Sequence, residues 1–403
     1  MELNIKTKKD ESQEMKEMKI GVIGVGGRGA IAQCAHRPGK GYRLVAGVDV
    51  NDEHLANFKK FVGDDVFLSK DYKKLLAIKD IDAVFVTSPD FLHEEHALAA
   101  LRAGKAVYLE KPMAITIEGC DKLLKMAYKT GSKLYLGHNM RHFPVILKMK
   151  EIIDSGIIGE VQAGWCRHFI NYGGDAYFRD WHSEQVNTTG LLLQKGAHDI
   201  DVMHWLMGSY TKTVVGMGML SVYDKCKRRS PKVPGSTAFI DAQWPPLEQK
   251  GFSPIINVED HNMVMMQLDN GSQACYMQCH YTPDAERNYT FIGTRGRVEN
   301  IGDSDRCEVH VWNRRTARET PDIIYKLKPQ EGSHGGSDPA IIQEFLNFVQ
   351  SGIKTNTSPI AARNSVAVGV QGHKSMRSGC NAMKIPPLPR ELVNYFEKGQ
   401  KKT

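Results

Sequence analysis

The stretch from Gln194 to His198 places an amide, an amine and an imidazole within five positions, directly after three leucines. Histidine titrates near neutral pH and suits a general base, whereas an amide cannot ionise and can only orient a hydroxyl group. On a helix, Gln194 shares a face with His198 at i, i+4, and Lys195 joins it at i, i+3. The spacing predicts a substrate site with His198 as the base. The alternative is a helix end with a satisfied histidine and a surface lysine.

A second group that could do chemistry is Glu110-Lys111-Pro112, which ends the apolar run 104–109. In folds built on an open parallel sheet, polar residues at the carboxyl ends of the strands face the bound ligand. If an alcohol is oxidised, its proton goes to a base, and a cation beside the developing alkoxide stabilises that charge. Lys111 fits this role, although a strand end with a lysine that reaches solvent would look the same.

The glycine loop "GVGGRG" at 24–29 indicates a nucleotide site. Its glycines at 24, 26 and 29 match G-x-G-x-x-G, follow the first predicted strand and open the first predicted helix, as a pyrophosphate site requires. Asp49 ends the second strand, where an acid binds ribose hydroxyls and repels a 2′-phosphate. NAD is therefore expected rather than NADP, although the nearby cation Arg28 could weaken that preference. The alternative is a tight turn with a capping aspartate.

These groups need a sheet to position them. Continuous apolar runs alternate with helical patterns at 51–61, 91–103 and 116–130, which predicts a parallel sheet with helices on both faces. After about residue 140 the stretches mix polar and apolar residues, and the hairpin signal "DNG" stands at 269–271. We expect a mostly antiparallel sheet with one covered face, followed by helices at 338–352 and 359–377.

The segments "TSPDFLHEEHALAALRAGKAVYLEKP" (87–112) and "GLLLQKGAHDIDVMHWL" (190–206), with the glycine loop, resemble the Gfo/Idh/MocA superfamily in their order. The resemblance covers most of residues 18–380. It implies an N-terminal Rossmann domain and a C-terminal α/β domain with a large open, mostly antiparallel sheet that often mediates oligomers. It also implies a nicotinamide cofactor and a sugar, polyol or glycoside substrate. We expect a flexible extension at 1–17, a Rossmann domain at 18–138 and a substrate and oligomerisation domain at 139–403.

The resemblance also assigns residues. The family lysine corresponds to Lys111 and the family histidine to His198, and the Lys111–Pro112 bond is expected to be cis. Two departures are Asp90, where the family has asparagine, and Gln194, where many polyol dehydrogenases have aspartate. The predicted cofactor residues are Gly24, Gly26, Gly27, Arg28, Gly29, Asp49, Thr87, Ser88, Pro89, His93, Glu110, Lys111, Arg179 and Trp181. The predicted substrate residues are Lys111, Asn139, Arg141, Gln194, Lys195 and His198. Arg141 could instead form a salt bridge at a domain hinge, and Trp181 could belong to the core.

Composition narrows the function classes. The chain has 403 residues, 41% of them hydrophobic, 25% charged, and a net charge of +7. The basic run 225–232 reads as a solvated loop rather than a nucleic-acid site, and no apolar run is long enough to span a membrane. The N-terminus lacks the apolar core of a secretory signal, and eight dispersed cysteines without a C-x-x-C pair favour a reducing cytoplasm. The scattered histidines predict no metal site.

The leading hypothesis is an NAD-dependent oxidoreductase that acts on a ring hydroxyl of a sugar or glycoside, with oxidation at C-3 favoured. One alternative is an NAD-dependent glycosidase that uses transient C-3 oxidation and elimination, with Lys195 or Tyr172 as the second base. A second alternative is an inositol or polyol dehydrogenase. A non-catalytic NAD-binding sensor is opposed by the presence of both Lys111 and His198.

Overall fold

The first sheet has six parallel strands in the order β3-β2-β1-β4-β5-β6. The structure is a computed structural model and describes residues 17–235, 244–303, 307–328 and 336–401. The strands are β1 (Met18–Ile23), β2 (Tyr42–Val48), β3 (Phe67–Ser69), β4 (Ala83–Val86), β5 (Ala106–Leu109) and β6 (Leu134–Leu136). Apart from the edge strand β3, these strands are largely buried on both faces, which explains the continuous apolar runs, and the predicted Rossmann domain is confirmed.

Local signals set the ends of the helices between these strands. Asn51 caps α1 (Asp52–Val62) by accepting from the backbone N–H groups of Glu53 and His54. Thr116 caps α4 (Ile117–Thr130), which ends at Gly131 with φ of 76°. The expected helix at 91–103 begins later, as α3 (His93–Arg102), because residues 90–92 form a separate 3-10 turn. The glycine loop opens a 3-10 helix, η1 (Gly27–Ala35), and α2 (Tyr72–Leu76) completes this half.

The second sheet has nine strands in the order β16-β15-β14-β13-β7-β12-β11-β8-β17, and only β7 and β12 pair in parallel. Its bounds are β7 (Val161–Phe169), β8 (Thr211–Met219), β11 (His261–Leu268), β12 (Gln273–Cys279), β13 (Glu286–Gly293), β14 (Gly296–Ile301), β15 (Glu308–Trp312), β16 (Ile323–Lys326) and β17 (Met383–Lys384). The predicted mostly antiparallel sheet is therefore confirmed.

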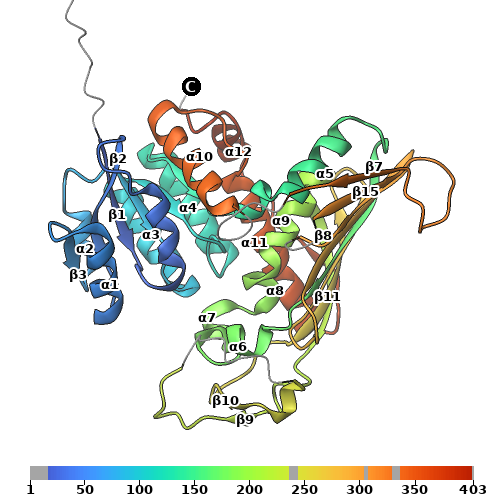
Figure 1. The fold of residues 1–403 in the computed structure, drawn as a ribbon, viewed down its shortest axis with the longest axis horizontal. Coiled ribbons are helices and arrows are strands. Elements are labelled where there is room, and N and C mark those ends of the chain that lie inside the picture. Colours follow the sequence, from blue (N-terminus) through green and yellow to red (C-terminus); the bar gives the residue numbers. More distant parts are fainter. Residues whose placement is uncertain (1–16, 236–243, 304–306, 329–335, 402–403) are drawn as a thin grey trace, which may run out of the picture.

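One layer of helices lies between the two sheets. Figure 1 shows α8 (Leu191–Gln194), α9 (Gly196–Met207) and α11 (Pro359–Arg377) on the inner face of the large sheet, toward the Rossmann domain. The outer face carries no helix in this view, and β11 alternates buried and exposed residues along its length. A smaller lobe below contains α6 (Gly173–Tyr177), α7 (Gln185–Thr188) and the short strands β9 (Lys227–Arg228) and β10 (Lys250–Phe252).

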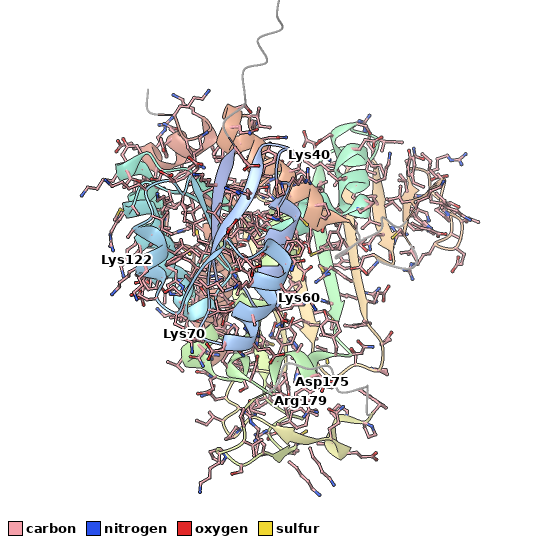
Figure 2. All side chains as sticks on the ribbon, turned by 60° about the vertical axis from the view of Figure 1, so that its left-hand side comes forward. Lys40, Lys60, Lys70, Lys122, Asp175 and Arg179 are labelled. Carbon is pink, nitrogen blue, oxygen red and sulfur yellow. The ribbon has the colours of Figure 1, made fainter. Side chains whose placement is uncertain are left out.

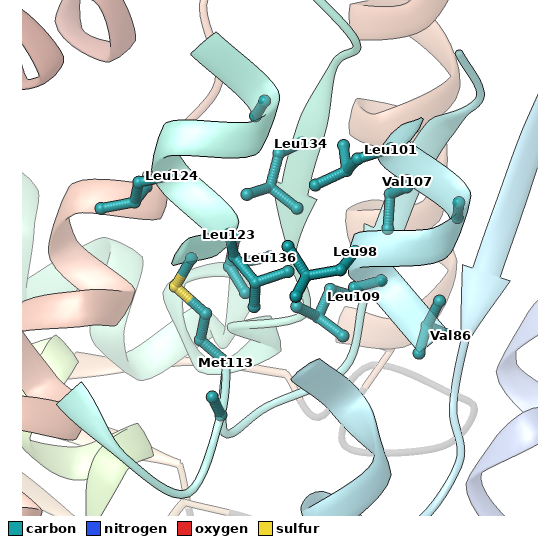
Figure 3. Close-up of a cluster of buried hydrophobic side chains, with 14 of the residues drawn as sticks. Val86, Leu98, Leu101, Val107, Leu109, Met113, Leu123, Leu124, Leu134 and Leu136 are labelled. Carbon is teal, nitrogen blue, oxygen red and sulfur yellow. The ribbon is translucent and has the colours of Figure 1, made fainter. Parts of the chain in front are cut away.

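The core of the Rossmann domain also receives residues from the end of the chain. Figure 3 shows part of the apolar cluster around β5, β6, α3 and α4, including Leu109 and Leu123. On the other side of the sheet, α10 (Ser337–Ser351) packs Phe345 against Phe85 and Tyr108, with ring centroids 5.4 and 5.6 Å apart. The division at residue 138 remains a proposal, since α10 completes the core of the first sheet from beyond it. The remaining helices are α5 (Pro144–Asp154) and α12 (Arg390–Glu397).

Candidate active site

The glycine loop packs too tightly for side chains. Gly24 has φ of 89°, and a Cβ there would lie 2.8 Å from the backbone nitrogen of Ser88. A Cβ on Gly29 would lie 2.1 Å from the carbonyl oxygen of Gly24. Bare backbone at the start of a helix is what a pyrophosphate site needs, so the loop fits a dinucleotide.

Asp49 directly follows β2 and touches the glycine loop. Its carboxylate accepts hydrogen bonds from the backbone N–H groups of Gly26, at 3.1 Å, and Asn51, at 3.0 Å. His54 Nδ1 lies 3.3 Å from the same carboxylate. The acid therefore sits beside the loop at the end of the second strand, where the ribose of a bound dinucleotide is expected.

Arg28 turns away from Asp49 and binds two other acids. Its guanidinium donates to Glu110 Oε1 at 2.8 Å and forms two bonds with the Asp338 carboxylate, at 2.7 and 2.9 Å. Glu110 also accepts from the Tyr108 hydroxyl at 3.2 Å. Arg28 and Glu110 thus join the loop to β5 and α10, and a direct contact of either with the cofactor remains a prediction.

The predicted segment 87–93 forms hydrogen bonds with the glycine loop and with the loop after β5. The Thr87 hydroxyl donates to the Gly24 carbonyl at 2.7 Å. The buried His93 ring has one nitrogen 2.7 Å from the Ser88 carbonyl oxygen and the other 2.7 Å from that of Pro112. Pro89 begins the 3-10 turn that follows. These contacts hold the strand ends of β4 and β5 side by side, and the Lys111–Pro112 bond is cis, as predicted.

Lys111 reaches from β5 to the stretch that carries His198. Its Nζ donates to the backbone carbonyl oxygen of Gln194 at 3.1 Å. Burial lowers the pKa of Lys111 to about 8, and the charge of Lys195 adds to this effect while Asp90 opposes it. Asp90 is buried, its Oδ2 has no hydrogen-bond partner in the described residues, and burial raises its pKa. The structure thus brings Lys111, Gln194 and Asp90 together.

His198 lies in the first turn of α9. The expected single helix is interrupted, because α8 ends at Gln194 and α9 starts at Gly196, so the prediction that Gln194 and His198 share a face of one helix is wrong. Burial and the charges of Lys111, His138 and Lys195 hold the pKa of His198 well below its ordinary value. The imidazole is therefore neutral at physiological pH, as a base must be before it accepts a proton.

Lys195 points to two tyrosines. Its Nζ donates to the Tyr172 hydroxyl at 3.0 Å and lies 5.3 and 5.7 Å from the ring centroids of Tyr172 and Tyr177. Burial would raise the pKa of Tyr172, but Lys195 and Arg287 lower it below its ordinary value. The pair therefore combines a buried ammonium with an acidified phenol, next to the His198 helix.

A buried network stands behind His198. Asp199 is fully buried and lies 2.7 Å from Arg287 Nε and 3.0 Å from His168 Nδ1. It also accepts hydrogen bonds from the hydroxyls of Tyr276 and Tyr289. The network ties α9 to strands β7, β12 and β13 and so positions the start of that helix.

The other predicted site residues are engaged in protein contacts. Asn139 donates to Asp338 at 2.9 Å, and Arg141 forms two bonds with Asp201, both at 2.7 Å. The Arg141–Asp201 contact is the salt bridge that the sequence offered as the alternative to substrate binding. Arg179 donates to Asp175 at 2.7 Å in the smaller lobe, where Figure 2 labels both residues.

Trp181 stacks on His182 with ring centroids 3.6 Å apart and meets Phe91 of the Rossmann domain at 5.7 Å. Within the part of the chain that the structure describes, no three potential metal ligands gather in one place. Ligand contacts of Asn139, Arg141, Arg179 and Trp181 remain predictions.

Sequence reasoning missed several residues of this cluster. Asp199 and Asp201 stand in the quoted "HDID" motif, so their closeness to His198 was a usable signal. His138 directly precedes Asn139 and could have been found in the same way. Arg287, Tyr276 and Tyr289 come from strands about 80 to 90 residues further on, and nothing in their local pattern connects them to α9.

The fold and the glycine loop define an oxidoreductase with an NAD-binding Rossmann domain and a C-terminal α/β domain. Residues 18–138 match the NAD-binding Rossmann-fold domain of the oxidoreductase family Gfo/Idh/MocA, and residues 150–385 match its C-terminal alpha/beta domain. The chain belongs to the Gfo/Idh/MocA family.

Individual relatives are more distant. YteT of Bacillus subtilis (strain 168) is 23% identical over 351 residues, which cover 76% of this chain and 82% of YteT. An inositol 2-dehydrogenase/D-chiro-inositol 3-dehydrogenase of Halalkalibacterium halodurans is 33% identical over 175 residues, 43% of this chain and 48% of its own length. The chain thus spans about half the length of that relative.

Solved structures share the fold. Levoglucosan dehydrogenase in complex with NADH has a TM-score of 0.74 at 17% identity, covering 93% of this chain and all of that one. The scyllo-inositol dehydrogenase of Lactobacillus casei has a TM-score of 0.68 at 21% identity, covering 92% of this chain and 99% of that one.

Proposed function

We propose that this protein is an NAD-dependent dehydrogenase that oxidises a secondary ring hydroxyl of a sugar or glycoside, with C-3 as the favoured position. One observation carries the proposal. The Lys111 ammonium bonds the backbone of Gln194, four residues before the neutral His198, beside a glycine loop that fits a dinucleotide. The names of relatives that act on inositols and levoglucosan support a polyhydroxylated ring as the substrate class.

The residues divide the work as follows. The bound nicotinamide ring supplies a hydride acceptor. His198 takes the hydroxyl proton, and the Lys111 ammonium stabilises the negative charge that develops on the substrate oxygen. Gln194, whose buried Oε1 has no partner in the described residues, orients a substrate hydroxyl as an acceptor. Lys195 holds a neighbouring oxygen.

A substrate panel tests the proposal. The wild-type protein is incubated with NAD and myo-inositol, levoglucosan, D-glucose or methyl β-D-glucoside, and NADH absorbance and product masses are followed. We expect NADH and a keto product two mass units below the substrate for at least one ring. Lys111→Met should abolish this turnover, whereas the matched Lys122→Met should not, because Lys122 is exposed on α4 and pairs with Glu94 (Figure 2). No NADH with any ring would contradict the proposal.

The Lys195–Tyr172 pair favours a second candidate, the NAD-dependent glycosidase. Oxidation at C-3 acidifies the proton at C-2, and elimination of the leaving group then needs a second base. Tyr172, with its lowered pKa and its 3.0 Å bond to Lys195, fits that base. Release of methanol from methyl β-D-glucoside without net NADH, lost in Tyr172→Phe, would favour this reaction over the dehydrogenase.

We also propose that the open sheet joins copies of this chain into a homo-oligomer. Its outer face exposes four methionines of the paired strands β8 and β11, at positions 217, 219, 263 and 265. An exposed apolar patch of this kind marks an interaction surface. Light scattering should report an oligomer for the wild type and a smaller species for Met217→Lys/Met263→Lys. An unchanged mass would contradict this interface.

We also propose that the protein is located in the cytoplasm. No disulfide joins any of the eight cysteines in the described residues, which suits a reducing cytoplasm. No helix in the described residues is long and apolar enough to cross a membrane.

A further inference from the structure

His138 is a second buried histidine beside the catalytic one. It lies between β6 and the 3-10 turn η3 (Asn139–His142) and is only 2% exposed. Its Nδ1 lies 3.0 Å from Asp201 Oδ2, and Arg141 holds the same carboxylate through two bonds of 2.7 Å. An ionised carboxylate only accepts hydrogen bonds, so Nδ1 of His138 carries a proton and Nε2 offers a lone pair.

The two histidine rings lie near each other, and in the described residues each has one buried nitrogen without a hydrogen-bond partner. The ring centroids of His138 and His198 are 6.1 Å apart. In the described residues, Nε2 of His138 and Nδ1 of His198 are both buried without a hydrogen-bond partner. Since no direct bond joins them at this separation, a bridging water is the ordinary way to satisfy two such buried atoms.

The surroundings of His198 also disfavour its protonated form. The cations Lys111, Lys195 and Arg287 all act against its charged form. His138 differs, because Asp201 is its direct partner, although Arg141 offsets part of that charge. His198 is therefore surrounded by cations, whereas His138 faces the carboxylate of Asp201.

We propose that His138 is the residue that receives the substrate proton from His198, through one water molecule, with Asp201 holding the resulting imidazolium. This inference rests on the proposed dehydrogenase function and adds a proton exit to it. The route leads away from the Lys195–Tyr172 pair, toward Asp201 and Arg141.

The transfer balances as follows. The substrate O–H bond breaks and its proton binds Nε2 of His198, while the hydride on the carbon that bears this oxygen would go to the bound nicotinamide, so that the carbon becomes a carbonyl. The Nδ1 proton of His198 passes to the water, and a water proton passes to Nε2 of His138. His198 is then neutral again, with its proton on the other nitrogen, and His138 is an imidazolium beside Asp201. The negative charge on the substrate oxygen is therefore at most that of a transient alkoxide.

The test compares His138→Gln and His138→Phe with His142→Gln. Glutamine can hydrogen-bond a water but cannot accept a proton, so it separates a relay from mere orientation. The control His142 lies four residues later, at the end of the turn η3, beside Glu344 rather than Asp201. With the panel sugar that the wild type oxidises fastest, both His138 variants should lose about 10- to 100-fold in kcat, less than the roughly 10²–10⁴-fold expected for loss of the base itself, while the KM for NAD is unchanged. His142→Gln should keep the wild-type kcat.

Two readouts distinguish the relay from a structural role. In the wild type the solvent isotope effect on kcat should depend nonlinearly on the deuterium fraction, because more than one proton moves, and this curvature should vanish in His138→Gln. Nitrogen-15 histidine spectra of the NADH complex should show His138 protonated at Nδ1, and this signal should change in Asp201→Asn.

A wild-type kcat and a curved isotope dependence in His138→Gln would overturn the relay. So would nitrogen-15 spectra with Nδ1 of His138 unprotonated. If the wild type reduces no NAD with any panel sugar, the proposed function fails instead, and the spectra alone decide the protonation of His138.

Discussion

Replacing Asp199 by asparagine should destabilise the C-terminal domain strongly. Asp199 is fully buried, and its carboxylate is the direct counter-ion of Arg287 at 2.7 Å. Asparagine has nearly the same shape and keeps one oxygen for the tyrosine hydroxyls. It removes the negative charge, however, and leaves a buried guanidinium without its closest compensating charge.

The magnitude follows from this geometry. Removing one partner of a buried ion pair costs about 3–5 kcal/mol, and the retained hydrogen bonds place Asp199→Asn near the lower end, about 3 kcal/mol. The second acid near Arg287, Asp303, is 3.4 Å away and makes up little of the loss. With a denaturant slope of about 3 kcal/mol per molar, the midpoint in urea should fall by about 1 M.

The pH dependence supplies an internal check. Burial would raise the pKa of Asp199, but Arg287 and His168 hold it far below its ordinary value. A carboxyl with a depressed pKa in the folded state stabilises the protein above its unfolded pKa, about 3.9, and loses that contribution as pH falls toward the folded value. The deficit of Asp199→Asn should therefore be full at pH 7 and shrink below about pH 4.

The assay is urea denaturation followed by circular dichroism and tryptophan fluorescence, at pH 7 and at pH 3.5. The matched control is Asp64→Asn, since Asp64 forms an exposed ion pair with Lys59 and should be replaceable without measurable effect. A midpoint for Asp199→Asn equal to that of the control would refute the reasoning. A deficit that persists unchanged at pH 3.5 would show that its cause is packing rather than charge.

Three further predictions concern the reaction. His198→Ala should lower kcat by about 10²–10⁴-fold while NADH fluorescence still reports binding, because the base lies apart from the glycine loop. Gln194→Ala should lower kcat by a smaller factor, since an amide can only orient the substrate. Asp49→Ser should narrow the preference for NAD over NADP, measured as the ratio of their dissociation constants, and equal affinities in the wild type would contradict this role of Asp49. With a Lys111 pKa of about 8, and activity requiring its ammonium, kcat should fall as pH rises through that value; a flat profile to pH 10 would exclude this function of the cation.

The features of this protein that depend on short-range contacts could be predicted from the sequence. Continuous apolar runs indicate strands buried on both faces, and the caps Asn51 and Thr116 mark helix starts through hydrogen bonds that span only two or three residues. The glycine loop is likewise recognised from a short-range pattern, whereas the cis bond at Lys111-Pro112 was expected from the family resemblance. The structure confirms the strands, the caps and the cis bond.

The chemistry around His198 was decided by strand register. Arg287 reaches Asp199 because β13 pairs with β7 so that Arg287 lies opposite His168, the other partner of that carboxylate. A shift of one residue would turn these side chains to the opposite face of the sheet, and the period-two pattern of a strand does not say which neighbour it will meet. The partner of His138 was likewise decided by the tertiary structure, because its contact with Asp201 exists only where β6 ends beside α9 in three dimensions.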